Sequence, residues 1–198
     1  MKRLLLCLPA VLLAGCAAST QEKTDGLTTE RSYPLDYAQQ FTVDECADGC
    51  TLITIAEDRY LVVPQGTAVP QGLDADITVL QQPIENIYLV STSAMDPILS
   101  IDGLDAVALS GTQAESWYLD AAKAAMQNGQ IAYAGKYSAP DYETILTADC
   151  GLAIENTMIY HTPEVKEQLE KLGVPVLVER SSYESGPLAR MEWVKLYG

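Results

Sequence analysis

The segment LAIENTMIYHTPEVKEQLEKLGVPVLV, residues 152–178, decides the fold class. It starts and finishes with short apolar runs, and a helical pattern lies between them. Thr162 stands at the N-cap position, Pro163 at the first helical position and Gly173 just past the last turn, where each residue type is favoured. A strand, a helix and a second strand in this order predict two parallel strands joined by a crossover helix.

The same alternation extends towards the N-terminus as far as residue 84. Apolar runs occupy residues 87–90, 106–109, 131–134, 152–154 and 174–178, and helical patterns occupy 97–101, 115–127, 142–146 and 163–172. Strands without polar alternation are typical of sheets that are buried on both faces. We therefore predict an α/β domain over residues 84–186, with an open, mainly parallel sheet and helices on both faces.

Residues 33–83 have a different pattern, with strands and turns but no helix. Apolar strand patterns at 51–55 and 60–63 flank a turn at Glu57 and Asp58, and Pro64 ends the second strand. A third strand is predicted at 77–80. The α/β domain is therefore expected to follow a small β-hairpin region.

The first 15 residues are typical of a bacterial lipoprotein signal peptide. Lys2 and Arg3 precede an apolar stretch at 4–13, which is shorter than the ~20 residues that a membrane-spanning helix needs. Leu12-Leu13-Ala14-Gly15-Cys16 then predicts cleavage before Cys16 and lipidation of its thiol. The alternative is an ordinary secretory signal in which Cys16 is incidental. Both interpretations place the protein outside the cytoplasm, and the first anchors it to the cell membrane, in the periplasm or on the outer face of the cytoplasmic membrane.

Residues 16–32 are polar and are expected to form a flexible tether between the lipid and the domain. Loss of Lys2 and Arg3 with the signal leaves 27 acidic and ten basic residues, a formal charge of −17. A protein this acidic is not expected to bind nucleic acid or anionic lipid headgroups.

Three cysteines remain after residue 16. Cys46 and Cys50 flank a turn-like spacer, so a disulfide is one interpretation and a zinc site is another. Two thiols without a neighbouring histidine fall short of a zinc ligand set. Cys150 is expected to pack in the core.

Open α/β sheets bind ligands beyond the carboxyl ends of their strands. Four predicted loops occupy that position, at 91–95, 135–137, 155–158 and 180–184. Lys136, Arg180 and Arg190 lie in or just after these loops. We therefore expect a locally positive edge on an acidic protein, suited to an anionic ligand.

Motifs of catalysis are missing from the sequence. It has no glycine-rich phosphate loop, no Gly-x-Ser-x-Gly elbow and no Cys-x-x-Cys pair. His161 is the single histidine, so neither a Ser-His-Asp site nor a multi-histidine metal site is expected. His161 itself is expected simply to precede a helix. The sequence predicts a binding protein without an intrinsic cofactor or metal, not an enzyme.

Four stretches between residue 86 and the C-terminus resemble a known family. These are GKYSAPDYE at 135–143, LAIE at 152–155, LEKLGVPVLV at 169–178 and PLARMEW at 187–193. In order and spacing they resemble the amino-terminal lobe of ABC-transporter substrate-binding proteins for iron-siderophore complexes and vitamin B12, the class III periplasmic binding proteins. The resemblance implies two α/β lobes joined by one long helix, with a ferric chelate or cobalamin held between them. Delivery would follow by docking onto the ABC permease and its ATPase. Residues 187–198 would start the connecting helix, and the second lobe is absent from this sequence.

The resemblance also assigns roles to individual residues. Glu143 matches a surface glutamate that meets arginines of the permease. Residues that match loops facing the cleft, or the start of the helix, are Ser93, Met95, Tyr137, Glu155, Asn156, Tyr183 and Arg190. Trp117 and Trp193 are expected to be packing residues.

Other functions remain open at this point. A zinc or manganese receptor would use several histidines and carboxylates as direct ligands, which a single histidine disfavours. An extracellular enzyme of flavodoxin-like architecture would need a catalytic group of residues that the sequence lacks. A non-catalytic surface lipoprotein is the remaining alternative.

Overall fold

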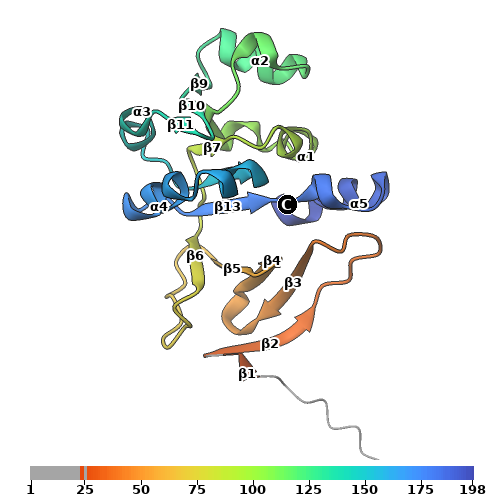
Figure 1. The fold of residues 1–198 in the computed structure, drawn as a ribbon. Coiled ribbons are helices and arrows are strands. Elements are labelled where there is room, and N and C mark those ends of the chain that lie inside the picture. The colour runs from red at the N-terminus through yellow and green to blue at the C-terminus, as the bar shows by residue number, and fades with distance from the viewer. Residues whose placement is uncertain (1–22, 25) are drawn as a thin grey trace, which may run out of the picture.

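The computed structural model describes residues 23–24 and 26–198, and Figure 1 shows two sheets stacked one above the other. The predicted signal peptide, Cys16 and the tether up to residue 22 lie outside the described residues. Among the described residues, no helix has the length and apolar character that a membrane span requires.

The upper sheet in Figure 1 has five parallel strands, as the sequence predicted. Its strands are β7 (Ile87–Leu89), β8 (Val107–Ser110), β9 (Ala132–Tyr133), β12 (Ala153–Asn156) and β13 (Val176–Glu179). Their spatial order is β13-β12-β7-β8-β9. The chain runs outward from β7 to β9, returns to β12 on the other side of β7, and then continues to β13. The direction of winding therefore reverses between β7 and β12, which is where open α/β sheets form ligand sites.

Helices cover both faces of this sheet, which confirms the predicted arrangement. They are α1 (Met95–Ser100), α2 (Asp120–Gln127), α3 (Tyr142–Thr147), α4 (Pro163–Lys171), α5 (Pro187–Glu192) and α6 (Val194–Tyr197). Short 3-10 turns are η1 (Ala47–Gly49), η2 (Thr92–Ala94), η3 (Gly103–Ala106), η4 (Ala114–Ser116), η5 (Thr157–His161) and η6 (Ser181–Tyr183). Ile145 of α3 and Leu169 of α4 belong to the core on one face, and Met95 and Ala122 of α1 and α2 belong to the core on the other.

The largest difference in a helix boundary is at the start of α2, and one predicted cap is also not formed. The helix expected over 115–127 begins at Asp120, because Trp117 is extended and donates its indole N–H to the hydroxyl of Ser110 (3.3 Å). Thr162 precedes α4 but makes no side-chain capping bond. Gly173 does terminate this helix, with a positive φ of 84°.

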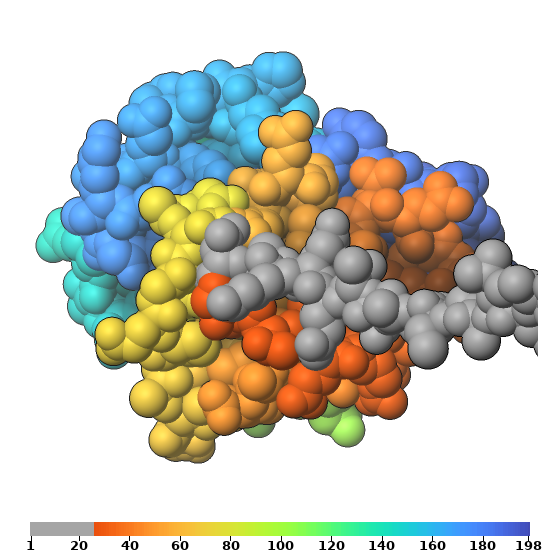
Figure 2. Space-filling model, turned by 90° about the horizontal axis from the view of Figure 1, so that it is seen from below, coloured from red at the N-terminus to blue at the C-terminus, as the bar shows by residue number. Residues whose placement is uncertain are grey.

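The second sheet has six strands in chain order. They are β1 (Lys23–Thr24), β2 (Leu27–Ser32), β3 (Phe41–Cys46), β4 (Thr51–Ile55), β5 (Asp58–Val63) and β6 (Ile77–Gln81). All neighbours are antiparallel except β5 and β6, which are parallel. The predicted hairpin and third strand are therefore present. In Figure 2 this sheet, coloured red to yellow, covers the lower face of the molecule.

The tether predicted over 16–32 is wrong for residues 27–32. These residues form β2, which pairs with β3, and Leu27 is buried in a cluster with Leu52, Leu61 and Ile77. One buried leucine and the backbone hydrogen bonds to β3 hold a segment that is otherwise polar.

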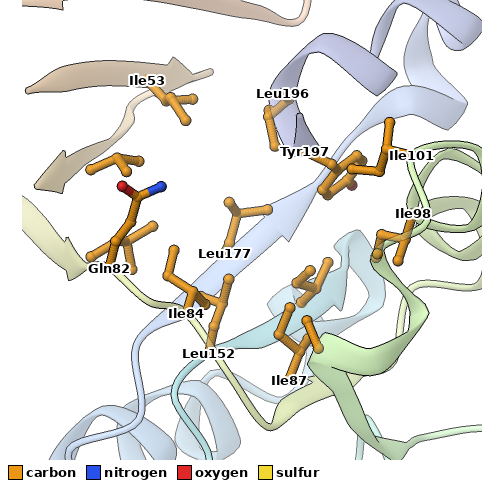
Figure 3. A pocket seen from close by; sticks show the side chains of 15 residues that line it. Ile53, Gln82, Ile84, Ile87, Ile98, Ile101, Leu152, Leu177, Leu196 and Tyr197 are labelled. Carbon is orange, nitrogen blue, oxygen red and sulfur yellow. The ribbon is translucent and has the colours of Figure 1, made fainter. Parts of the chain in front are cut away.

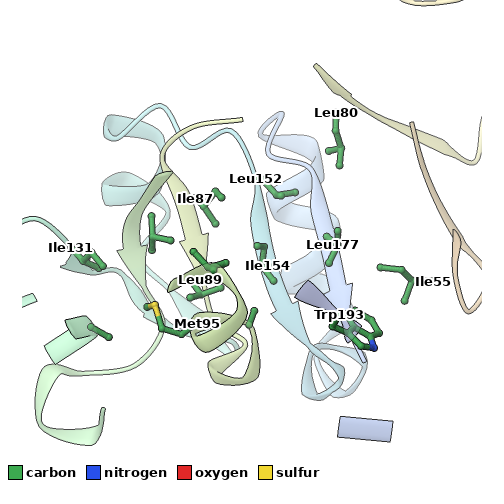
Figure 4. Close-up of a cluster of buried hydrophobic side chains, with 14 of the residues drawn as sticks. Ile55, Leu80, Ile87, Leu89, Met95, Ile131, Leu152, Ile154, Leu177 and Trp193 are labelled. Carbon is green, nitrogen blue, oxygen red and sulfur yellow. The ribbon is translucent and has the colours of Figure 1, made fainter. Parts of the chain in front are cut away.

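A common core joins the two sheets (Figure 4). Ile55 and Leu80 of the antiparallel sheet belong to the same cluster as Ile154 and Leu177 of the parallel sheet. The buried hydroxyl of Tyr60 donates to the carbonyl of Val176 (3.2 Å) and accepts from the amide of Val178 (3.4 Å). Tyr60 thus satisfies backbone groups along the edge of β13 that no further strand pairs with.

The residues predicted to start the inter-lobe helix are helical in the structure, with one interruption. Residues 187–198 are helical but divide at Trp193 into α5 and α6. Trp193 is fully buried, packs on Phe41 with ring centroids 4.8 Å apart, and donates its indole N–H to Glu184 (3.0 Å). These contacts turn the chain onto the core, and α6 packs beside α1.

Two buried carboxylates hold the loop at residues 36–40. Glu192 accepts the backbone amides of Asp36, Tyr37 and Ala38 at 2.7–2.8 Å, and Glu184 accepts those of residues 39 and 40 at 2.9–3.0 Å. Burial raises the pKa of Glu192, but hydrogen bonds from Lys195 and from the loop outweigh it and lower the pKa to about 2. We call this arrangement the loop clamp.

Candidate functional site

The carboxyl edge of the parallel sheet brings together loops that lie far apart in the sequence. Glu179, at the end of β13, is almost fully buried. It accepts hydrogen bonds from the hydroxyls of Ser91 (2.8 Å) and Ser93 (2.6 Å) and from the amide of Ser181 (2.8 Å). The loop after β7 is therefore tied to the loop after β13, across the end of β12. Glu179 is a site residue that the sequence analysis did not predict. Its position at the end of an apolar strand is the signal that could have identified it, because a carboxylate buried there needs hydrogen-bond donors.

An aromatic and cationic group lies beside this connection. The guanidinium carbon of Arg180 lies 4.9 Å from the ring centroid of Tyr183, within cation–π range. The Tyr183 hydroxyl lies 3.2 Å from the Thr157 hydroxyl. Arg180 also donates to the Gln40 side chain (3.4 Å), and among the ion pairs of residues 26–198 none includes it. Its charge is therefore not neutralised by a direct carboxylate partner.

Two further side chains extend this group along the edge. Arg190, exposed on α5, donates to the carbonyl of Ser182 (3.2 Å). Tyr160, from η5, is partly exposed. Its pKa is raised, because burial and the charge of Asp58 outweigh the opposite effect of the neighbouring Arg180. We call Thr157, Tyr160, Arg180, Tyr183 and Arg190 the Arg180 cluster. Thr157 and Tyr160 had not been predicted as site residues.

Three of the predicted cleft residues lie at this edge besides Arg190. Ser93 is exposed and bonded to Glu179, and Tyr183 is 56% exposed. Asn156 lies at the same edge but accepts the amide of Met158 (2.9 Å), so its side chain caps η5.

The prediction that Met95 and Glu155 face a ligand cleft is wrong, because both side chains are fully buried. Met95 belongs to the core under α1. Glu155 lies within β12, where strand alternation places it on the same sheet face as Ala153, the face covered by α3 and α4. Within the described residues neither carboxyl oxygen of Glu155 has a hydrogen-bond partner, and burial raises its pKa to about 8.

Tyr137 follows the carboxyl end of β9, the strand farthest from β13 in the parallel sheet. It belongs to a hairpin formed by β10 (Gly135–Lys136) and β11 (Ala139–Pro140) and packs partly against the core around Ile145. Gly135 has a φ of 82°, and a Cβ there would collide with the carbonyl oxygen of Ala139. Lys136 lies on this hairpin and is not part of the Arg180 cluster, which contains the other two predicted cations, Arg180 and Arg190.

Other predicted residues have these surroundings. Glu143 is exposed on α3. Trp117 and Trp193 are buried, as expected of packing residues, and so is Cys150. Cys46 and Cys50 are buried free thiols in the structure, so the disulfide interpretation is not realised there. Among residues 26–198, no three or more His, Cys, Asp or Glu side chains gather in a way that could hold a metal ion.

The edge that carries the Arg180 cluster is a surface built on a rigid sheet, and it offers guanidinium, phenol and hydroxyl groups. These groups can bind an oxygen-rich or anionic molecule through charge-assisted hydrogen bonds and ring stacking. Comparison of the sequence with protein-family models gives no match, and comparison with curated proteins gives none either.

Proposed function

We propose that this protein is a substrate-binding lipoprotein of an ABC importer, which captures a ferric-siderophore complex or a corrinoid and delivers it to the membrane permease. The observation that supports this best is the Arg180 cluster at the carboxyl edge of a parallel sheet, next to the reversal in strand order. The proposal includes two further points: the α/β domain is the amino-terminal lobe of a class III binding protein, and a lipid on Cys16 anchors the protein to the membrane.

The chemistry of the cluster favours an anionic chelate. An arginine that lacks a carboxylate partner can donate to several oxygens of one ligand, and its planar group keeps a fixed orientation. The exposed Tyr183 ring adds a stacking surface. A bare zinc or manganese ion would need clustered histidines or carboxylates, and residues 26–198 provide no such group.

Delivery would use a different part of the surface. Glu143 lies exposed on α3, so pairing with a permease arginine would need no rearrangement of the core. No bound cofactor of its own is part of the proposal, because the chelate is the cargo.

Equilibrium dialysis of the full chain against a ferric hydroxamate, a ferric catecholate, haem and cobalamin tests the function. We expect one of these classes to bind, and Arg180→Gln to weaken binding roughly 10- to 100-fold, the loss expected for a charged hydrogen bond. Arg31→Gln is the matched control, because Arg31 lies on β2 and pairs with Glu45. Absence of binding in all four classes would leave a non-transporting surface lipoprotein as the better description. Equal binding by Arg180→Gln would remove the cluster from the site.

A further inference from the structure

Cys46 and Cys50 face each other at the closed end of the hairpin between β3 and β4. The regular pairing of these two strands ends with Glu45 opposite Thr51. One residue further along each strand, the amide of Cys46 donates to the carbonyl of Cys50 (2.8 Å). The two cysteines are therefore hydrogen-bonded neighbours across the hairpin.

Both cysteine side chains lie on the same face of the antiparallel sheet, because opposite residues of a ladder point to one side. Ile53 of β4 lines a cavity of about 230 Å³ between the two sheets (Figure 3). Side chains alternate along a strand, so Leu52 and Cys50 point to the other face. On that face, Cys46 and Cys50 belong to one buried cluster with Leu52.

The backbone brings the two cysteines within the span of a disulfide. The Cα atoms of a hydrogen-bonded antiparallel pair lie about 5.5 Å apart, and disulfides usually join Cα atoms that are about 4.4–6.8 Å apart. The sulfur of Cys46 lies 3.7 Å from the carbonyl oxygen of Asp44, and a thiol donates only weakly in such a contact. Closing the bond therefore needs rotation of side chains but no change of register.

The turn between the cysteines is already formed. Asp48 and Gly49 have positive φ values of 61° and 72°, a conformation that aspartate and glycine adopt more readily than most residues. The amide of Cys50 also donates to the carbonyl of Ala47 (3.3 Å). Because these residues already hold the chain ends together, little further chain entropy is lost when the two sulfurs join.

We propose that Cys46 and Cys50 form a disulfide that closes this hairpin, with a disulfide-containing oxidant as the electron acceptor. One cysteine thiolate attacks the oxidant and a first thiol leaves, and the second cysteine thiolate then attacks the mixed disulfide and a second thiol leaves. Two cysteines are oxidised, the oxidant is reduced to two thiols, and the two cysteine protons end on the released sulfurs. Cys150 stays reduced, because it belongs to the core of the other sheet.

Burial of both thiols indicates when the bond forms. Both side chains are almost fully buried, and burial raises the pKa of each thiol. Since the thiolate is the reactive form, exchange with an external disulfide is slow once the sheet has folded. The bond therefore forms while the chain folds. This step needs the oxidising surroundings of the proposed location, but it uses no ligand and no residue of the Arg180 cluster.

Peptide mapping of the full chain tests the proposal. The protein is refolded from urea in a buffer of reduced and oxidised glutathione, alkylated with iodoacetamide in urea without reductant, and digested with trypsin. Residues 32–59 form one tryptic peptide with both cysteines, and residues 137–166 form another that contains Cys150. We expect peptide 32–59 to be unmodified and two hydrogen atoms lighter than its dithiol form, with Cys150 alkylated as the internal control. Alkylation of either hairpin cysteine, or its linkage to glutathione or to another peptide, would overturn the proposal.

Thermal unfolding tests whether the bond fits the folded hairpin. Closure of the short loop from Cys46 to Cys50 should raise the Tm by roughly 4–8 °C over that of protein refolded with dithiothreitol. Cys46→Ala is the matched control, because it cannot form the bond and its Tm should be the same after both treatments. An equal or lower Tm for the oxidised wild type would show that the bond strains the hairpin, against the proposal. If Cys46→Ala does not fold, peptide mapping of the wild type decides the outcome.

Discussion

Glu155→Gln should make the protein's stability less dependent on pH. The wild-type carboxyl group is fully buried on β12 without a hydrogen-bond partner among the described residues, and burial raises its pKa from 4.5 to about 8. Below pH 4.5 the group is protonated in both the folded and the unfolded protein, so it adds no pH dependence. Between pH 4.5 and 8 the unfolded chain releases the proton while the folded protein keeps it. The free energy of unfolding therefore falls by about 1.4 kcal/mol for each pH unit in this window, and levels off above it.

The size of the effect follows from the width of that window. Between pH 5 and pH 8 the wild-type protein should lose about 4 kcal/mol of stability through this one group, as an upper value. Glutamine does not ionise, so Glu155→Gln removes this slope. A buried amide without partners adds a cost of about 1–3 kcal/mol, but that cost is the same at every pH. The difference in slope, and not the stability at one pH, is therefore the quantity to compare.

Urea unfolding of the full chain, followed by tryptophan fluorescence at pH 5, 6, 7 and 8, measures this slope. Glu143→Gln is the matched control, because Glu143 is an exposed glutamate on α3 and the variant should keep the wild-type slope. If Glu155→Gln and the wild type lose stability in parallel between pH 5 and pH 8, the carboxyl group is not a buried neutral acid and our reasoning is refuted.

Two more substitutions test the contacts that join the sheets and the termini. Glu192→Ala should lower the free energy of unfolding by about 2–4 kcal/mol at pH 7, because three loop amides lose their acceptor. Since the pKa of Glu192 is lowered from 4.5 to about 2, its contribution is complete above pH 4.5 and is lost as the pH falls towards 2. Wild type and variant should therefore converge in urea unfolding at pH 2, and a constant gap down to that pH would count against the clamp. Tyr60→Phe should cost about 1–3 kcal/mol by chemical unfolding, because buried groups of Val176 and Val178 lose their partner, and a cost near zero would contradict that role.

The sequence predicted the parallel sheet well because its strands carry few polar positions, so burial on both faces leaves a clear signal. It failed where one or two residues decide the structure. Leu27 alone in a polar segment gives no periodicity, yet it fixes β2 in the sheet. Glu155 follows an apolar run and was expected to face a cleft, but strand alternation turns it into the interior under α3 and α4.

The candidate site was predictable in position but not in detail. The rule that ligands bind at carboxyl ends of parallel strands located Ser93, Asn156 and Tyr183 together. Their hydrogen-bond partners were not visible, because Glu179 meets Ser93 across 86 residues of chain. Such contacts depend on strand order, and strand order is not encoded in any local pattern.

The loop clamp has a consequence for biosynthesis. Residues 36–40 emerge from the ribosome well before Glu184 and Glu192, so five backbone amides have to wait for acceptors that are made last. Phe41 likewise waits for the Trp193 ring. A nascent chain that stalls before residue 184 would leave this end of β3 uncovered, and chaperones or proteases would meet it in that state.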